Sequence, residues 1–401
     1  MKTLIIGGGA AGCFAAVRAA ELGQQVTLLE RNDRLGKKLR ITGKGRCNLT
    51  NDCDMETLMR HIPHGSRFLY SAFAACSPQD VMAYFEGLGV ALKVERGNRV
   101  FPVSDQAAEV AEALVSELER LGVTVIHDRV TGLMIKQDRC CGVSCGTKVY
   151  KADRVILAAG GATYPGTGSE GDGYRLAEQA EHIITPLRPS LVPLETLERD
   201  CAEMMGVSLK NVTLTMCRNG KTVFSELGEM LFTHFGVSGP LVLSASAHME
   251  GEGTYTLHID LKPALTPEQL DKRLQREITA APNKTLPSLL RRLVPANMVM
   301  PLIGRCAIPV HTRGNSLTKT QRNRICAELK NFAFTVRRTR PMAEGIITRG
   351  GVLCKEVNPK TMESKLLPGL YFAGEVLDCD AYTGGFNLQI AWATAYIAAM
   401  G

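Results

Sequence analysis

The residues with the clearest chemical role lie in a glycine-rich segment near the start of the chain. Residues 7–12 have the sequence GGGAAG, which fits the pattern GxGxxG. At this spacing Gly7 permits a tight turn, Gly9 lets the backbone approach a pyrophosphate, and Gly12 allows a helix to pack closely on a strand. Glu30 follows Gly12 by 18 residues and can accept hydrogen bonds from both hydroxyls of a ribose. Because its charge also disfavours a 2′-phosphate, the pattern predicts a dinucleotide other than NADP.

The segments around these residues have the hydrophobic pattern that the motif requires. Residues 3–6 are a short apolar run, typical of a buried parallel strand. An alanine-rich helix is expected from about 11 to 22, and a second strand over 26–29. The N-terminus of such a helix offers N–H groups and partial positive charge to phosphates. A glycine-rich turn in another α/β fold is the alternative, but the order of elements favours a dinucleotide-binding βαβ unit.

Two later segments favour FAD over NAD. Residues 153–161, DRVILAAGG, predict a strand that runs into small residues, and they resemble the second FAD motif of two-dinucleotide-binding flavoproteins. Residues 369–375, GLYFAGE, resemble the last motif of these proteins, with Glu375 in place of an aspartate. A final helix is expected from Leu388 to about Met400, with its N-terminus facing the flavin. FAD is therefore the predicted cofactor, in a site built from both ends of the chain.

A second glycine-rich segment, residues 166–171, also fits GxGxxG and also follows a predicted strand. No βαβ unit with a terminal acid follows it, and Pro186 and Pro189 break the pattern. We therefore expect a loop over the flavin here, with an NAD(P)H-binding domain as the alternative.

Longer blocks of the sequence resemble one family of flavoproteins. Residues 36–51, GKKLRITGKGRCNLTN, look like the signature of the YhiN-type, aminoacetone-oxidase-like flavoproteins. The resemblance continues through residues 99–102, 231–240, 361–365 and 374–378. A local departure at residues 379–382 leaves substrate specificity near Tyr382 open. The resemblance implies an FAD-binding Rossmann domain, a β-rich insertion with a small helical subdomain, and activities that include amine oxidation and reduction of a steroid-type enone.

Residues 30–46 contain seven Lys and Arg against two acids, which suits a pyrophosphate, although a solvated basic loop is the alternative. The motifs and the resemblance together predict these cofactor-binding residues: Gly7, Gly9, Ala10, Ala11, Gly12, Glu30, Arg31, Lys38, Thr42, Gly43, Gly45, Arg46, Cys47, Asn48, Val130, Ala158, Ala159, Gly160, Gly161, Gly374, Glu375, Gly385, Phe386, Asn387 and Leu388. Within this set, we expect Asn387 to begin the last helix.

The cysteines are expected to be reduced thiols. Cys47 and Cys53 have five residues between them, whereas the redox pair of disulfide reductases has four, so we expect structural or flavin-lining thiols. No cluster of cysteine and histidine has a metal-binding spacing, and no metal is predicted.

Residues 186 to about 340 lack the Rossmann periodicity. Alternating segments at 212–216 and 254–259 predict strands, and a helical pattern begins at Thr266. We therefore predict an α/β fold with a Rossmann-like FAD-binding domain of the two-dinucleotide-binding flavoprotein type, residues 1–185 plus 341–401. The insertion, residues 186–340, is expected to be a β-rich, barrel-like substrate domain with a helical subdomain at about 266–335. His234 in this insertion is the candidate catalytic acid or base, and a structural histidine is the alternative.

The composition narrows the classes of partner. The 401 residues carry a net charge of +7, which does not by itself predict nucleic-acid binding, and no nucleic-acid partner is expected. No apolar run is long enough to span a bilayer, so we expect a cytoplasmic protein without a membrane partner. The oligomeric state is left open.

The predicted function is an FAD-dependent oxidoreductase that transfers a hydride between flavin N5 and a small or medium organic substrate. Amine oxidation and enone reduction are both open, with NAD(P)H as a candidate transient electron donor. One alternative is a flavin-dependent tRNA-modifying enzyme, suggested by Arg322, Arg324 and Lys330, although few aromatic residues accompany these charges. The other alternative is a flavin-binding regulatory protein without turnover.

Overall fold

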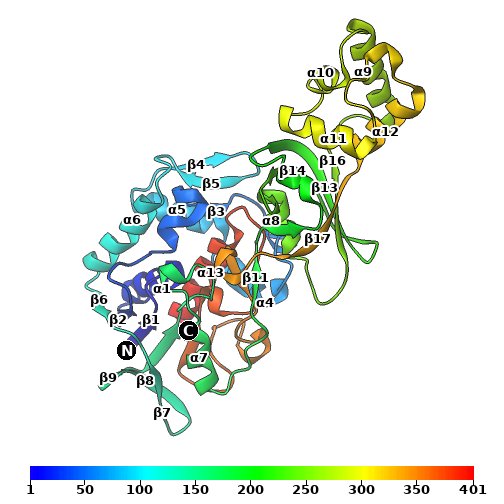
Figure 1. Cartoon of the computed structure of the whole chain (residues 1–401). Coiled ribbons are helices and arrows are strands. Elements are labelled where there is room, and N and C mark those ends of the chain that lie inside the picture. Colours follow the sequence, from blue (N-terminus) through cyan, green and yellow to red (C-terminus); the bar gives the residue numbers. More distant parts are fainter. The chain divides into compact units, whose positions relative to one another are not determined.

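The computed structural model describes all 401 residues, which form two compact units. The Rossmann unit comprises Met1–Ser190 and Pro341–Gly401, and the barrel unit comprises Leu191–Arg340. Figure 1 shows the elements of both units, and each unit is described by itself.

The Rossmann unit is built on a five-stranded parallel sheet with the strand order β19-β10-β1-β2-β6. In chain order these strands are β1 (Lys2–Ile6), β2 (Gln25–Glu30), β6 (Thr124–His127), β10 (Arg154–Leu157) and β19 (Leu370–Phe372). Their side chains are mostly apolar and buried, as expected for a parallel sheet that is covered on both faces. The last strand of the chain therefore lies in the same sheet as the first.

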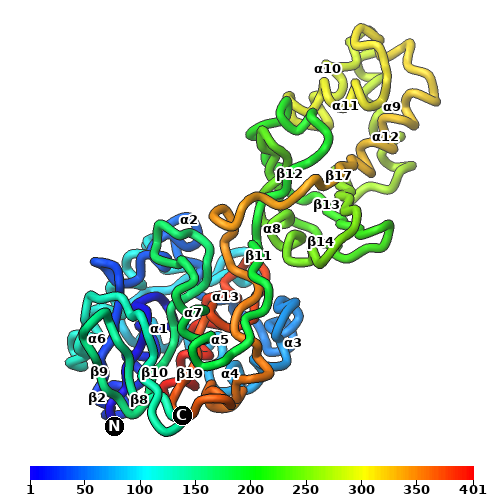
Figure 2. Tube along the Cα trace, turned by 60° about the horizontal axis from the view of Figure 1, so that its bottom comes forward, coloured from blue at the N-terminus to red at the C-terminus, as the bar shows by residue number.

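Two helices far apart in the sequence pack together next to this sheet. Helix α1 (Ala10–Glu21) and helix α13 (Phe386–Met400) are in extensive contact, and Figure 2 shows the blue and red segments side by side. Trp392 of α13 is fully buried against the rings of Phe14 and Phe85. Its indole N–H donates to the carbonyl oxygen of Leu49 at 2.9 Å. These contacts join the two ends of the chain in one core.

Smaller elements surround the sheet. The remaining helices of the Rossmann unit are α2 (Thr42–Gly45), α3 (Met55–Arg60), α4 (Ser66–Ala75), α5 (Pro78–Gly87), α6 (Ala107–Arg120) and α7 (Asp172–Gln179). One antiparallel sheet has the order β3-β5-β4, with β3 (Thr50–Asn51), β4 (Leu92–Glu95) and β5 (Arg99–Pro102), and another contains β7 (Gly132–Lys136), β8 (Arg139–Cys145) and β9 (Lys148–Lys151). Strands β11 (Arg188–Ser190) and β18 (Ile347–Arg349) pair with each other, so the chain leaves and re-enters this unit at neighbouring points.

The barrel unit contains a closed barrel of six strands in the order β12-β15-β14-β13-β16-β17. These are β12 (Leu194–Thr196), β13 (Ser208–Arg218), β14 (Lys221–Phe232), β15 (Gly236–Ser238), β16 (Tyr255–Asp260) and β17 (Phe332–Thr339), with α8 (Pro240–Ser246) packed against β14. Asn219 and Gly220 both have positive φ in the tight β13–β14 turn, as this dipeptide predicts. The predicted fold class, a Rossmann-type α/β fold with a barrel-like insertion, is confirmed.

Four helices are inserted between β16 and β17: α9 (Pro267–Ala280), α10 (Leu286–Leu290), α11 (Val299–Cys306) and α12 (Lys319–Lys330). A capping box formed by Thr266 and Gln269 starts α9, which explains why the helical pattern begins at this residue. No helix anywhere in the chain is both long and apolar enough to cross a membrane.

Candidate functional site

The glycine-rich loop between β1 and α1 is tightly packed on two sides and open at one position. Gly7 has φ +101°, and a Cβ atom there would lie 2.6 Å from the carbonyl oxygen of Ala158. A Cβ atom at Gly12 would lie only 1.7 Å from the carbonyl oxygen of Gly7. At Gly9, by contrast, a Cβ atom would meet nothing within 4 Å. The loop therefore leaves free space at Gly9, where the motif places a pyrophosphate.

The start of α1 can bind an anion. No side chain caps this helix, whose first residues are Ala10 and Ala11, so the N–H groups of its first turn remain available. Such a group of N–H donors with the positive end of the helix dipole suits a phosphate. The loop and the helix together form the cradle that a dinucleotide requires.

Glu30 closes this cradle at the end of β2. The side chain is buried, and its Oε2 accepts a hydrogen bond from the N–H of Gly8 at 2.6 Å. Its Oε1 accepts from both the backbone and the side-chain amide of Asn32, at 2.8 and 2.6 Å. The carboxylate is thus held next to the glycine-rich loop, where a ribose would lie. Val130, also predicted at the cofactor, is buried after the end of β6.

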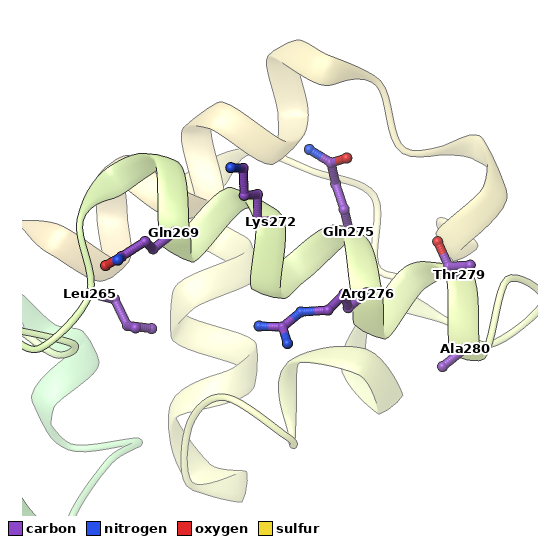
Figure 3. A pocket seen from close by; sticks show the side chains of 7 residues that line it. All are labelled: Leu265, Gln269, Lys272, Gln275, Arg276, Thr279 and Ala280. Carbon is purple, nitrogen blue, oxygen red and sulfur yellow. The ribbon is translucent and has the colours of Figure 1, made fainter.

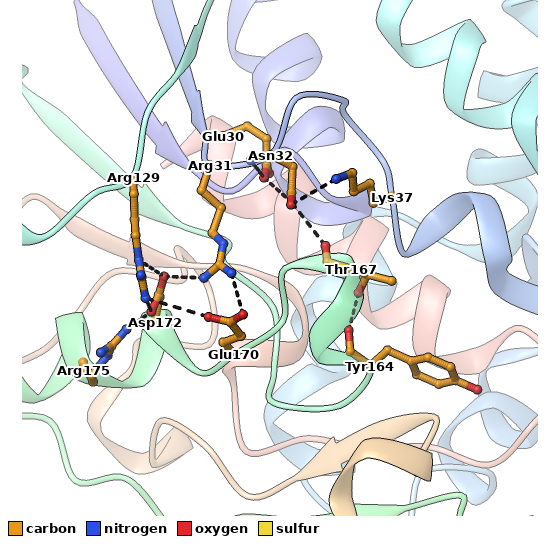
Figure 4. A network of polar contacts seen from close by, with 10 residues as sticks. All are labelled: Glu30, Arg31, Asn32, Lys37, Arg129, Tyr164, Thr167, Glu170, Asp172 and Arg175. Atoms are coloured by element: carbon orange, nitrogen blue, oxygen red, sulfur yellow. Dashed lines mark hydrogen bonds and ion pairs between the residues drawn. The ribbon is translucent and has the colours of Figure 1, made fainter.

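The second glycine-rich loop is fastened to the same end of β2 (Figure 4). Asn32 donates to the carbonyl oxygen of Thr167 at 3.2 Å. Arg31 forms ion pairs with Glu170 at 2.8 Å and with Asp172 at 3.0 Å, and this arginine holds the pKa of the Glu170 carboxyl below its usual range. The loop that we expected over the flavin therefore lies against the Glu30 end of the cradle. Both acids thus engage the Arg31 guanidinium, and the contact of Arg31 with the cofactor stays a prediction.

A lysine and a glutamate join three distant segments on another side of the cradle. Lys38 Nζ lies 2.8 Å from Glu375 Oε2 and donates to Thr163 Oγ1 at 2.9 Å. Glu375 Oε1 also accepts from the backbone N–H of Thr348 at 2.8 Å. A Cβ atom at Gly161 would come within 2.6 Å of this carboxylate, so only glycine fits there. The predicted residues Lys38, Gly161 and Glu375 are brought together, whereas Thr163 and Thr348 were missed because no motif marks them.

Other glycines follow the carboxyl ends of β10 and β19. Gly160 has φ +74° after Ala158 and Ala159, and Gly374 has φ +75°. A Cβ atom at Gly374 would lie 2.8 Å from the Cβ atom of Ala11, so this turn packs directly on α1. Both turns lie at the carboxyl edge of the sheet, where ligands of open α/β sheets bind.

The family signature forms an unusual loop in which Gly43, Lys44, Gly45 and Cys47 all have φ between +57° and +83°. The Thr42 hydroxyl donates to the carbonyl oxygen of Leu39, which fixes the start of this loop.

Complete burial raises the pKa of the Cys47 thiol to about 12, so the thiol is protonated at neutral pH. Cys47 and Cys53 are both free thiols.

Arg46 in this loop pairs with two acids that the sequence did not reveal. Its guanidinium forms ion pairs with Glu95 at 2.5 Å and with Asp105 at 2.6 Å, and it lies over the ring of Phe101 at 4.2 Å. The charge of Arg46 therefore stabilises the β4–β5 hairpin, and the contact of Arg46 with the cofactor stays a prediction.

Helix α13 begins at Phe386, one residue before Asn387, where we expected the last helix to begin. Gly385 has φ +97°, and a Cβ atom there would lie 2.3 Å from the carbonyl oxygen of Thr50. With its amide oriented to satisfy both groups, Asn48 accepts a hydrogen bond from the Gly385 N–H at 3.1 Å. The Asn387 side chain binds the backbone N–H and carbonyl of Ala381, at 2.9 and 2.8 Å. It therefore supports the preceding loop, while the N–H groups from Phe386 to Leu388 have no side-chain cap.

Proton-holding side chains that the sequence did not reveal lie at this end of α13. The His61 ring stacks on Phe386 with centroids 4.5 Å apart, and Tyr382 lies edge-on to His61 at 5.8 Å. Nearby in the sequence, His64 Nδ1 lies 2.8 Å from Asp380 Oδ1. In each pair one partner comes from the first part of the chain and the other from its end, so no local pattern could have indicated these contacts.

His234, the predicted catalytic residue, lies in the barrel unit between β14 and β15. Its side chain is exposed and contacts the ring of Phe235 at a centroid distance of 5.0 Å. It has no hydrogen-bonding partner that would orient it as an acid or base, and its catalytic role stays a prediction. No group of three His, Cys, Asp or Glu side chains in the chain is arranged to hold a metal ion.

Three proteins with assigned names are similar to this chain over nearly its whole length. The 3-dehydro-bile acid delta(4,6)-reductase of Clostridium scindens is 34% identical over 98% of this chain and 97% of its own. The ribosomal RNA dihydrouridine synthase of Haemophilus influenzae is 30% identical over 100% of this chain and 98% of its own. The protein of the same name from Escherichia coli K12 is 31% identical, over 99% and 96% of the two chains.

The family model described as HI0933-like protein Rossmann domain matches residues 1–401. This match confirms the resemblance to the YhiN-type flavoproteins, and with it FAD as the cofactor and oxidoreductase as the class of enzyme. The protein therefore belongs to the HI0933-like family of Rossmann flavoproteins.

Proposed function

We propose that this protein reduces a carbon–carbon double bond that is conjugated with a carbonyl group, with NAD(P)H as the electron donor. The observation that carries this proposal is the pair of reactions named for its relatives. A 3-dehydro bile acid with double bonds at positions 4 and 6 contains an enone. The uracil ring of uridine also contains a C=C bond conjugated with a carbonyl, and dihydrouridine lacks this double bond. The same type of reaction, reduction of a C=C bond conjugated with a carbonyl group, therefore accounts for the names of both relatives.

The residues of the Rossmann unit fit FAD. In this proposal residues 1–185 and 341–401 bind FAD, and residues 186–340 form the substrate domain. The open position at Gly9 and the uncapped start of α1 accept the pyrophosphate, and the buried Glu30 accepts the ribose. When bound, FAD supplies the hydride that is delivered to the carbon β to the carbonyl.

The protein must supply the rest of the reaction. Net reduction adds one hydride and one proton, so a proton has to reach the carbon α to the carbonyl. Tyr382 and His61 lie together at the start of α13 and are the candidates to hold this proton. The uncapped N–H groups at Phe386 and Asn387 favour negative charge at the same end of the helix.

Amine oxidation is the competing reaction, and transient kinetics separates the two. Under anaerobic conditions, NADH or NADPH is expected to bleach the flavin absorbance of the holoenzyme, and a conjugated enone or uridine in RNA is expected to restore it. If amines bleach the flavin while both nicotinamides leave it oxidised, the proposed direction of electron flow is wrong.

Replacement of Glu30 is expected to weaken FAD binding without unfolding the protein. The Glu30→Ala variant loses charge-assisted hydrogen bonds to the ribose, with a total expected loss of roughly 1–3 kcal/mol, which corresponds to about tenfold to hundredfold in affinity. Equilibrium dialysis of the holoenzyme measures this loss.

Asp33→Ala is the matched control, because it removes an equal charge from a nearby exposed side chain that is paired with Lys37. This variant should retain FAD as the wild type does. Equal FAD retention in Glu30→Ala and Asp33→Ala would contradict the assigned role of Glu30.

A further inference from the structure

The positive charge of this protein is concentrated in one part of the chain. We define the helical subdomain as residues 261–331, which include α9 to α12. It contains thirteen Lys and Arg against four Asp and Glu, a net charge of +9. Because the whole chain carries +7, the rest of the chain carries −2. The average composition therefore hides a strongly basic module.

Most of this charge is not neutralised within the protein. Three of the four acids of the helical subdomain, Asp271, Glu277 and Glu328, already form ion pairs with arginines. Seven exposed cations form no ion pair: Lys272, Arg276, Lys284, Arg291, Arg313, Lys319 and Arg324. An excess of unpaired like charge destabilises a small folded module through self-repulsion, so an anionic partner would stabilise this subdomain.

Two of these cations line one groove on α9. Lys272 and Arg276 are one turn apart on α9, and with Gln269 and Gln275 they line an open groove of about 820 Å³ (Figure 3). At the end of this helix the Gly314 N–H donates to the Lys284 carbonyl oxygen at 3.0 Å.

The backbone segments around Lys284 and Gly314 also pair at the neighbouring residues. Thr285 pairs with Arg313 in a short antiparallel bridge, and the side chains of Asn283 and Asn315 are hydrogen-bonded at 3.3 Å. Lys284 and Arg313, both exposed, thus lie on neighbouring segments of the backbone shortly after the end of α9. The side chains that line the groove include cations, amides and a hydroxyl, which are donors that contact phosphates and sugars in complexes with nucleic acids.

We propose that the helical subdomain binds the phosphate backbone of a folded RNA. This inference deepens the proposed function, because uracil is an RNA base with a double bond conjugated with a carbonyl group. It replaces the sequence-based expectation that nucleic acids are not partners. The names of two relatives, which act on ribosomal RNA, are consistent with it.

The composition of the helical subdomain favours paired RNA over unpaired strands and over an anionic membrane. Residues 261–331 contain no Phe, Tyr or Trp, the rings that most often stack on unpaired bases, so the composition favours contacts to the phosphates of paired RNA. Its large exposed apolar side chains are Met300 and Val310, too few for the apolar face with which a helix enters an anionic membrane.

The inference is tested by removing four of the seven cations from the holoenzyme. The subdomain variant carries Lys272→Gln, Arg276→Gln, Lys284→Gln and Arg313→Gln. The control variant carries Lys136→Gln, Lys151→Gln, Lys221→Gln and Lys360→Gln, four exposed lysines outside the subdomain without an ion pair. Both variants lose the same net charge. The probe is a fluorescein-labelled RNA hairpin, and binding is followed by anisotropy over a range of salt concentrations.

The wild type and the control variant should bind the hairpin equally. The subdomain variant should bind at least about tenfold more weakly, and its slope of log K against log salt should fall by about 3 to 4, close to 0.9 per lost phosphate contact. Equal binding by all three proteins, equal loss in both variants, or binding of phosphatidylserine vesicles in preference to the hairpin would each overturn the assignment.

A second measurement separates this inference from the proposed reaction. Oxidation of NAD(P)H in the presence of cyclohexenone reports reduction of a conjugated double bond without RNA, and both variants should match the wild type. If the wild type reduces the enone but does not bind the hairpin, the RNA surface is wrong and the proposed function stands. If the hairpin binds through the subdomain but no conjugated double bond is reduced, the proposed function is wrong and the binding surface stands.

Discussion

Gly12→Ala is expected to prevent both folding of the Rossmann unit and binding of FAD, whereas Gly9→Ala should only weaken the binding. A methyl group at Gly12 would lie 1.7 Å from the carbonyl oxygen of Gly7, so α1 and β1 would have to separate. The expected loss exceeds about 4 kcal/mol, a large part of the roughly 5–15 kcal/mol that stabilises a typical domain.

Gly9→Ala is the matched variant, because the same methyl group is added within the same loop. Gly9 has φ −81°, which alanine adopts without strain, and its Cβ atom would meet nothing within 4 Å. The methyl group would instead occupy the space assigned to the pyrophosphate, with an expected loss of about hundredfold in FAD affinity, or roughly 3 kcal/mol.

Circular dichroism of the apoproteins and titration with FAD separate the two effects. The apo form of Gly9→Ala should melt with the wild type, and that of Gly12→Ala should be unfolded or much less stable. If Gly9→Ala binds FAD with full affinity, the position assigned to the pyrophosphate is wrong. If Gly12→Ala is stable and binds FAD, the described packing of α1 on the loop is wrong.

Trp392→Ala is expected to lower the free energy of unfolding by about 3–5 kcal/mol, the usual range for a fully buried aromatic residue. The side chain joins α13 to Phe14 of α1 and to Phe85 of α5, and its N–H donates to the Leu49 carbonyl. Loss of this contact weakens the core that holds both ends of the chain together. Chemical unfolding followed by circular dichroism measures the effect, since Trp392 is the single tryptophan of the chain.

Trp392→Phe keeps an aromatic ring and removes the indole donor. It should cost less than the alanine variant, with a loss of about 1–3 kcal/mol for the carbonyl left unpaired. Equal stability of Trp392→Ala and the wild type would show that α13 does not contribute to the core as described.

The parts of this molecule that sequence reasoning predicted are governed by local rules. The requirement at Gly12 comes from the carbonyl oxygen of Gly7, five residues earlier, and the positive φ of Gly7 belongs to the same turn. The tight turn at Asn219 and Gly220 and the capping box at Thr266 are equally local. The motifs at residues 153–161 and 369–375 indicated FAD, and the alternating segments at 212–216 and 254–259 indicated the β-rich insertion, in agreement with the family signature.

The parts that sequence reasoning missed depend on pairings between distant residues. Thr163 and Thr348 surround Glu375 only because three loops meet, and His61 contacts Tyr382 from the opposite end of the chain. Arg31 and Arg46 were assigned to phosphates from their charge, yet each is held by two carboxylates whose positions the sequence does not reveal. Similarly, a net charge averaged over the chain concealed the basic helical subdomain.

The strand order β19-β10-β1-β2-β6 has a consequence for how the protein is made. Strand β1 ends at Ile6 and β19 begins only at Leu370, so nearly the whole chain is synthesised between them. At about 5–20 residues per second, this interval lasts roughly 20–70 seconds. The barrel unit is complete before the Rossmann sheet receives its last strand and α1 receives α13. The apolar surface of α1 is therefore uncovered on the nascent chain, where it is open to chaperones and to aggregation, and FAD can be taken up only by finished chains.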